Sequence, residues 1–231
     1  MTGQRGRSCD ITVRMSDITT VVDRVTTERG ELVLRRSGEH FEIISNGVFL
    51  MDTRNGDSER LLVREALARV RPGARLLIGG LGVGFSLVEA VASPVPAEIV
   101  VLEIEKHLIE WHNDALAVVT GDALTDPRVR LVNADLVGWL HGTDETFDAI
   151  CLDIDNGPDW TVFEGNCALY DESGLGLLRE RLTPGGVLAI WSAAASPEYA
   201  ARLAAAIGAV TTCLIEVPRG EPDVVYLARR A

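Results

Sequence analysis

The sequence predicts an α/β protein with a doubly wound, mostly parallel sheet of seven strands, preceded by a small antiparallel β-meander. Three observations support this prediction. From residue 74 onward, short apolar runs alternate with segments of helical composition, as in a parallel sheet whose two faces are covered by helices. A glycine-rich turn follows the first of these runs. Before residue 57, short runs rich in Val, Ile and Thr are separated by turn residues instead, which indicates hairpins.

Composition limits the class of protein. The chain has 231 residues, of which 47% are apolar and 24% charged, as in a globular protein with a substantial core. Its net charge of −12 disfavours nucleic acid as a partner. No apolar stretch approaches the roughly 20 residues of a membrane span, and the first ten residues lack the apolar core of an export signal. The four cysteines have no metal-ligand spacing, so we expect reduced, buried thiols in a cytoplasmic protein without a metal site.

The N-terminal segment is expected to form the meander over residues 11–56, after a disordered tail of residues 1–10. Asn46-Gly47 is the pair most typical of a tight hairpin turn. So small a sheet buries little apolar surface by itself, and we expect it to pack on the main domain or on another subunit. Strand-favouring runs occupy residues 11–27, 31–36, 40–44 and 48–51.

The remaining segment, residues 57–231, is expected to form the doubly wound domain. A helix begins at Asp57-Ser58 and ends before Pro72-Gly73. The segment 218–222 contains two prolines and a glycine and joins the last two strands, which indicates an antiparallel hairpin at the sheet edge. Strands are expected at 75–79, 98–103, 129–133, 147–153, 186–191, 211–217 and 223–229. Further helices are expected near 84–92, 105–118, 135–140, 170–182 and 197–208.

The glycine turn is the predicted ligand-binding element. Gly79, Gly80, Gly82 and Gly84 lie between an apolar strand and a helix. This arrangement brings a nucleotide against backbone N–H groups at a helix N-terminus. Glycine suits the turn because a Cβ would hinder both a positive φ and the close approach of a ligand. Such turns also occur in proteins that bind no nucleotide, so the acidic residues at the strand ends decide the interpretation.

Three strands end beside a carboxylate, at the edge where a doubly wound sheet binds its ligand. Glu103 lies 23 residues beyond Gly80, a spacing that suits an acid accepting hydrogen bonds from ribose hydroxyls rather than one merely exposed at a strand end. Asp135 is predicted either to accept the exocyclic amine of adenine or to cap the next helix. Asp153 and Asp155 follow a buried strand, where carboxylates are costly unless they are paired or face a polar ligand. We therefore place the chemistry at these two residues.

Together these motifs resemble the spermidine synthase family, part of the Rossmann-like S-adenosylmethionine-dependent transferases. The resemblance covers about residues 30 to 192 and rests on the glycine turn and on the segments VLEIE, NAD and LDIDNGP. It implies that the turn holds the methionine-derived tail, Glu103 the ribose and Asp135 the adenine amine, with Asp153 beside the attacking amine. It also places Tyr170 where the family has an aromatic residue after the active-site loop, and it implies a homodimer.

The chain also departs from the family's pattern. Gly82 stands where the family has an acid for the amine of a decarboxylated tail. Asn156 stands where the family has a second Asp, for which Asp155 compensates only in part. Val63 and Arg64 replace a tyrosine–histidine pair, and an arginine facing a diamine would repel it. These differences favour intact S-adenosylmethionine as the cofactor over its decarboxylated form.

We therefore expect a transferase that moves an alkyl group, with methyl favoured, to a small polar acceptor that bears an amine. Asp153 would orient the acceptor or remove its proton. Trp160 and Phe163 would close over the acceptor as part of a lid, unless they only pack the loop. The alternatives are aminopropyl transfer of the spermidine synthase type, an NAD-dependent oxidoreductase, and a nucleoside-binding scaffold without turnover. No catalytic His, Lys or Tyr arrangement for NAD chemistry is evident, and Asp153 with Asp155 favours chemistry over a scaffold.

Overall fold

The computed structural model describes residues 19–154, 156–158, 164–217 and 220–231. The chain divides into two compact units, with the boundary between Arg54 and Asn55. The first unit is all-β and the second is a larger α/β domain. The tail expected at residues 1–10 lies outside the described residues.

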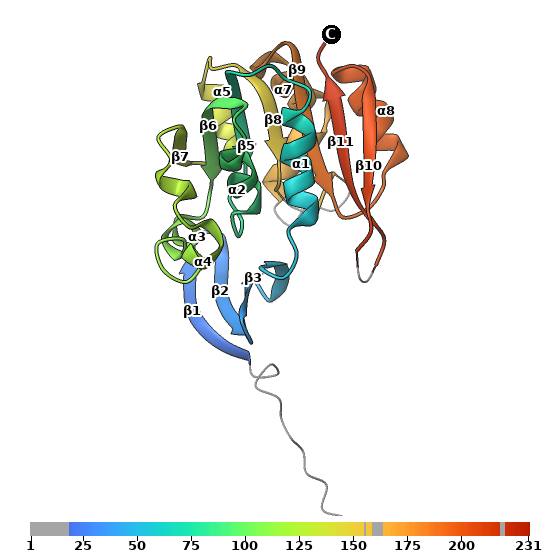
Figure 1. Cartoon of the computed structure of the whole chain (residues 1–231). Coiled ribbons are helices and arrows are strands. Elements are labelled where there is room, and N and C mark those ends of the chain that lie inside the picture. The colour runs from blue at the N-terminus through green and yellow to red at the C-terminus, as the bar shows by residue number, and fades with distance from the viewer. Residues whose placement is uncertain (1–18, 155, 159–163, 218–219) are drawn as a thin grey trace, which may run out of the picture. The chain divides into compact units, whose positions relative to one another are not determined.

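The N-terminal unit is an antiparallel sheet of four strands in the order β1-β2-β3-β4 (Figure 1). Asn46 and Gly47, between β3 and β4, have φ values of 50° and 79°, the left-handed pair that a two-residue hairpin requires. The Asn46 side chain accepts a hydrogen bond from the backbone of Glu31 and donates one to that of Arg29. The predicted meander is therefore confirmed from residue 19 onward. Its strands are β1 (Thr19–Thr27), β2 (Gly30–Ser37), β3 (His40–Ser45) and β4 (Val48–Asp52).

The second unit contains a seven-stranded sheet in the order β10-β11-β9-β8-β5-β6-β7. Neighbours from β9 to β7 pair in parallel, whereas β11 runs antiparallel to both β9 and β10. This confirms the predicted sheet and its antiparallel edge. The strands are β5 (Ala74–Gly79), β6 (Pro96–Glu103), β7 (Val129–Asn133), β8 (Phe147–Leu152), β9 (Leu182–Ser192), β10 (Val210–Ile215) and β11 (Asp223–Arg229).

Strand β9 begins four residues earlier than expected. Leu182 already pairs with Phe147, and the register then shifts before Val187 pairs with Ala149. Pro184 and Gly185, whose φ is 79°, lie in the shifted stretch. A proline and a positive-φ glycine are typical of a turn, but a bulge accommodates them within a strand.

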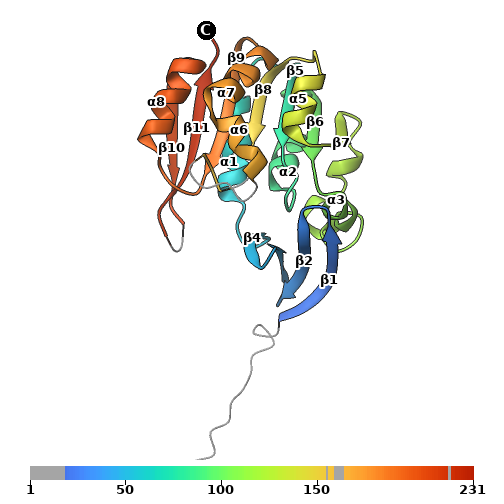
Figure 2. The same cartoon turned by 180° about the vertical axis from the view of Figure 1, so that it is seen from behind.

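Helices cover both faces of this sheet, with α1 and α2 on one face (Figure 1) and α5, α6, α7 and α8 on the other (Figure 2). The helix expected near 105–118 is two short helices, and the one expected near 170–182 divides at Asp171. Asp171 ends one helix and caps the next by accepting a hydrogen bond from Gly174 N. The helices are α1 (Asp57–Leu67), α2 (Phe85–Ala92), α3 (Lys106–Trp111), α4 (Ala117–Thr120), η2 (Ala123–Thr125), α5 (Leu136–Gly142), η3 (Glu164–Asn166), α6 (Cys167–Tyr170), α7 (Glu172–Arg181) and α8 (Pro197–Ala206).

The central strands are apolar along their whole length because both of their faces are covered. Leu76, Leu77 and Ile78 of β5 are all fully buried, although successive side chains point to opposite faces. Cys151 of β8 is buried as expected, but Cys167 is exposed, so the expectation of buried thiols is wrong for that residue. Among the described helices, none has both the length and the apolarity that a membrane crossing requires.

Candidate active site

The glycine turn connects β5 to α2 at the carboxyl end of the central strand. Gly80, Gly82 and Gly84 have φ values of 94°, 52° and 97°, so the predicted positive-φ turn is confirmed at these three glycines. A Cβ on Gly80 would collide with the backbone oxygen of Asp153, and one on Gly79 would press against the Leu136 side chain. Glycine therefore allows the turn to pack directly against the residue that follows β8.

His112, which the sequence interpretation missed, stabilises this turn. The side chain is 3% exposed, and its Nε2 lies 2.9 Å from the backbone oxygen of Gly82. Burial lowers the pKa of His112, so we assign a neutral ring whose Nε2–H donates to that oxygen. The sequence offered no signal for this contact, because the two residues are 30 positions apart.

Glu103, at the end of β6, connects the turn to the neighbouring loop. Its Oε2 accepts a hydrogen bond from Leu81 N at 2.9 Å and its Oε1 accepts one from Glu105 N at 2.8 Å. Burial raises the pKa of Glu103, and these backbone N–H groups oppose that rise. Because each carboxylate oxygen has a second lone pair, both oxygens can still accept ribose hydroxyls. That role stays a prediction.

Asp135 is the N-cap of α5, since its Oδ2 accepts a hydrogen bond from Gly138 N at 2.7 Å. The capping alternative is thus confirmed, while the contact with adenine stays a prediction. The neighbouring Asn133 donates from Nδ2 to the backbone oxygens of Glu103 and Ile104. The segment Asn133-Ala134-Asp135 therefore fixes the loop after β7 against the end of β6.

Asp153 lies directly after β8, against the glycine turn. Its backbone N–H donates to the Gly79 oxygen at 2.8 Å, and its Oδ2 accepts a hydrogen bond from Ser86 Oγ at 2.8 Å. Ser86 belongs to the first turn of α2 and is 1% exposed. The hydrogen bond from Ser86 therefore holds Asp153 against the first turn of α2.

Two further carboxylates, which the sequence interpretation also missed, act on Asp153. Glu59 lies in the first turn of α1, and Ser58 Oγ donates to its Oε2 at 2.9 Å. Asp223 is the first residue of β11, where its side chain is half-buried. The three acids come from α1, the end of β8 and β11, which are distant in sequence, so no local pattern predicts their meeting.

The surroundings of these three acids raise the pKa of each of them. Burial first, and then the charges of Glu59 and Asp223, raise the pKa of Asp153 to about 7, which the Ser86 hydrogen bond only partly offsets. Burial also raises the pKa of Glu59 and of Asp223, and the charge of Asp223 adds to the rise at Glu59. The charge of Asp223 thus acts on both Asp153 and Glu59, and an accumulation of acidic groups favours a cationic ligand.

The other predicted site residues are placed as follows. Arg64 is exposed and its Nε lies 3.0 Å from Glu89 Oε1, so the structure does not bring it to the three carboxylates. Tyr170 is buried and its hydroxyl donates to the Ile154 oxygen, which supports the segment after Asp153. The backbone oxygen of Asn156 accepts a hydrogen bond from Ala193 N. The remaining three, Asp155, Trp160 and Phe163, lie outside the described residues.

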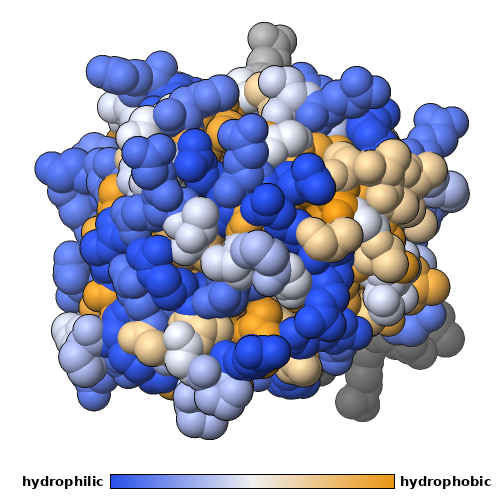
Figure 3. Space-filling view, turned by 90° about the horizontal axis from the view of Figure 1, so that it is seen from above, coloured by the Kyte–Doolittle hydropathy of each residue, from blue (hydrophilic) through white to orange (hydrophobic). Residues whose placement is uncertain are grey.

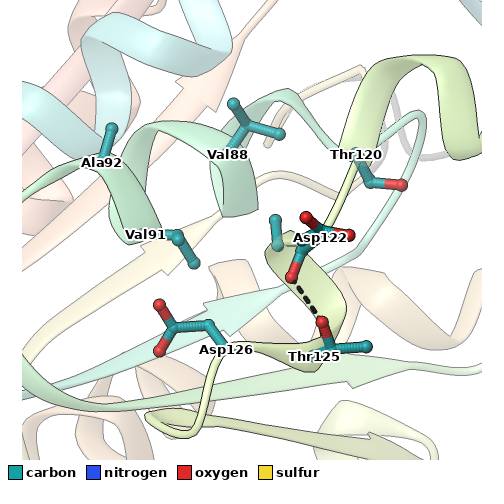
Figure 4. A pocket seen from close by; sticks show the side chains of 8 residues that line it. Val88, Val91, Ala92, Thr120, Asp122, Thr125 and Asp126 are labelled. Atoms are coloured by element: carbon teal, nitrogen blue, oxygen red, sulfur yellow. Dashed lines mark hydrogen bonds between the residues drawn. The ribbon is translucent and has the colours of Figure 1, made fainter.

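Two hollows in the second unit lie elsewhere. One of about 470 Å³ lies between α2 and the segment from Thr120 to Asp126, with Val88 and Val91 on its apolar side (Figure 4). The other, of about 230 Å³, is lined by Arg69, Asp148, Arg229 and the β9 bulge at the amino ends of the parallel strands. Seen from above, the surface of the molecule is mostly hydrophilic (Figure 3). Neither hollow is lined by the three acids or Glu103, so we place the chemistry at the glycine turn.

Within the described ranges, no group of three or more His, Cys, Asp or Glu side chains is arranged to hold a metal ion.

Comparison with known proteins identifies the family of the chain. The spermine/spermidine synthase domain matches residues 61–210, well over half of the chain. The chain therefore belongs to the spermine/spermidine synthase family, which confirms the resemblance inferred from its motifs.

Curated relatives are polyamine aminopropyltransferases. One from Mycobacterium tuberculosis is 30% identical over 165 residues, covering 69% of this chain and 30% of that protein. Polyamine aminopropyltransferase 2 of Ralstonia nicotianae is 25% identical over 185 residues, covering 79% of this chain and 35% of that protein. The chain thus spans about a third of the length of these relatives.

Solved structures share the fold. A spermidine synthase in complex with the transition state analogue AdoDATO has a TM-score of 0.74 and 17% identity, covering 91% of this chain and 74% of that chain. Spermidine synthase from Thermotoga maritima has a TM-score of 0.71 and 16% identity, covering 91% and 72%. At such identities the likeness is one of fold, and it confirms the predicted class.

Proposed function

We propose that this protein transfers the aminopropyl group of decarboxylated S-adenosylmethionine to an amine acceptor of the polyamine class. The observation that carries this proposal is the meeting of Asp153 and α1 at Ser86, whose Oγ is 2.8 Å from Asp153 Oδ2 and 3.4 Å from the Glu59 backbone oxygen, where the charges of Glu59 and Asp223 both act on Asp153. Their negative charge favours a donor whose tail ends in an ammonium group and disfavours a tail that also carries a carboxylate. Membership of the family and the activities of its curated relatives favour the same donor.

The preference for methyl transfer is therefore not supported. It rested on Gly82 and Arg64, which were expected to remove an acid from the site and to add a repelling cation. In this proposal the negative charge that Glu59 and Asp223 add beside Asp153 takes the place of the acid absent at Gly82. Arg64 is exposed and paired with Glu89. Both sequence arguments against a cationic tail and a cationic acceptor thus lose their basis.

In the proposed reaction, the acceptor ammonium first gives one proton to Asp153, which frees the nitrogen lone pair. The nitrogen then attacks the propyl carbon bonded to the sulfonium sulfur. A C–N bond forms as the C–S bond breaks, and the electron pair of the C–S bond stays on sulfur. The products are a secondary ammonium ion and the neutral thioether methylthioadenosine. The chain's contribution is mainly to position the reactants and to accept the proton.

Other residues receive supporting roles in this proposal. Glu103 holds the ribose, Asp135 the adenine amine, and the glycine turn the donor's tail. Asn156 is assigned to the acceptor side of the site, and Tyr170 supports Ile154 from the core. The roles of Asp155, Trp160 and Phe163 stay predictions. The homodimer and the cytoplasmic location stay predictions.

Calorimetry on the purified protein tests the donor. We expect decarboxylated S-adenosylmethionine to bind at least about tenfold more tightly than the intact compound, a difference of about 1.4 kcal/mol. Methylthioadenosine should bind, and NAD should not. Tighter binding of the intact compound would overturn the donor assignment and restore methyl transfer. Binding of none of the four would favour a scaffold, and binding of NAD alone an oxidoreductase.

His112→Ala should weaken methylthioadenosine binding roughly five- to tenfold, because the buried oxygen of Gly82 loses its donor and the turn is less well held. His107→Ala is the matched control, since His107 is half-exposed and contacts only Glu110 among the ion pairs formed by the described residues. Calorimetry measures both variants. An affinity of His112→Ala equal to that of the control would show that this hydrogen bond does not order the turn.

A further inference from the structure

Ser86 occupies the junction between the glycine turn and the acids. Its Oγ is 2.8 Å from Asp153 Oδ2 and 3.4 Å from the backbone oxygen of Glu59. The side chain is 1% exposed, so water does not substitute for these contacts. A serine hydroxyl has one hydrogen, and the shorter, charge-assisted bond to Asp153 is the stronger of the two. Ser86 thus donates to Asp153.

We propose that Ser86 is a positioning residue that holds Asp153 ionised and in one orientation beside the glycine turn. This inference rests on the function proposed above. In this proposal Oδ2 keeps the hydrogen bond from Ser86, and Oδ1 receives the acceptor's proton. Because α2 begins directly after the turn, Ser86 also couples the donor-binding element to the proton acceptor. A shift of the turn therefore moves Asp153 with it.

The charges around Asp153 explain why such a donor is needed. Glu59 on α1 and Asp223 on β11 both oppose ionisation of Asp153. Cys151, in β8 two residues before Asp153, has a pKa raised by its burial, so it stays a neutral thiol. The Ser86 hydrogen bond acts in the opposite direction and favours the carboxylate. Removing it leaves burial and two negative charges to keep Asp153 protonated, and a protonated Asp153 cannot accept a proton.

The test compares Ser86→Ala with Ser86→Thr, which keeps a hydroxyl, and with Ser45→Ala, a buried serine of the β1–β4 sheet. For Ser86→Ala we expect the acidic limb of kcat/KM to move upward by about half to one pH unit, with kcat about tenfold lower. Affinity for methylthioadenosine should stay within about twofold, since Ser86 does not contact the nucleoside in this proposal. Ser86→Thr should restore the limb, and Ser45→Ala should leave it unchanged.

A second measurement keeps this inference separate from the proposed function. In carbon-13 NMR of protein labelled at aspartate, with Asp153→Asn to assign the signal, Ser86→Ala should move the titration of Asp153 to higher pH even if no aminopropyl transfer occurs. Absence of turnover in the wild type, with that titration shift present, would refute the function and retain the role of Ser86. A titration of Asp153 at the same pH in Ser86→Ala and wild type would overturn the role of Ser86.

Discussion

Asp153→Asn is expected to lower kcat for aminopropyl transfer by about 10²- to 10⁴-fold, the usual contribution of a positioned general base. Asparagine keeps the size of the side chain and an oxygen that accepts from Ser86, but it cannot take up a proton. The affinity for methylthioadenosine should therefore change little. Steady-state kinetics and calorimetry measure the two quantities, and full activity of Asp153→Asn would remove the acid from the mechanism.

Asp144→Asn is the matched control, because the Asp144 side chain is fully exposed. Its kinetics should be those of the wild type.

In the wild type, kcat/KM should rise with pH through about 7, as Asp153, whose pKa is raised to about 7, becomes ionised. A pH profile that is flat from pH 5 to 8 would contradict this assignment.

Asp153→Asn should also stabilise the fold above neutral pH. The pKa of Asp153 is about 7 in the folded protein and about 3.9 in an unfolded chain. Between these values the folded state binds more protons, so the free energy of unfolding falls as pH rises, by at most about 4 kcal/mol in total. Asparagine does not titrate, so the Asp153→Asn variant lacks this loss of stability. In thermal unfolding, the Tm of Asp153→Asn should be higher than that of the wild type at pH 8 and close to it at pH 4.

Glu103→Ala is expected to weaken nucleoside binding at least about a hundredfold, because two hydrogen bonds from ribose to a charged acceptor, each worth about 1.5 to 3 kcal/mol, are lost. The variant also leaves Leu81 N and Glu105 N without their carboxylate acceptor. Glu110→Ala is the control, since Glu110 is exposed and pairs with Lys106 on the helix surface. Methylthioadenosine affinity, measured by calorimetry, should separate the two variants. A folded Glu103→Ala that binds within about threefold of the wild type would refute the ribose role.

Much of the fold could be predicted because its causes are local. A run such as Leu76–Ile78 is apolar on both faces only if helices cover both faces of the strand. Asn46-Gly47 similarly specifies its own hairpin through its backbone angles. The prediction was wrong where tertiary structure overrides local preference, as in the bulge that extends β9 through Pro184.

The site was predictable only in part. Glu103 and Asp153 are recognisable because each follows an apolar strand, and parallel strands end at one edge of the sheet. Ser86 and Asp153 are 67 positions apart, and Glu59 and Asp223 are distant from both. Such meetings depend on the packing of α1 and β11, which no local pattern encodes. The carboxylates that changed the proposed donor belong to this second group.

The position of Asp223 on β11 has a consequence for the order in which the domain is assembled. Synthesis delivers the chain from its N-terminus, so β5 to β9 can pair before Asp223 is made. During that interval Asp153 has one acidic neighbour fewer. When β11 inserts between β9 and β10 it brings the additional repulsion, but it also buries Val224, Val225, Tyr226 and Leu227. Burial of a large apolar side chain contributes about 1.5 to 3 kcal/mol, which opposes that repulsion. Strand β11 therefore brings the last of the three acids, Asp223, and also the apolar side chains whose burial holds the strand in the sheet.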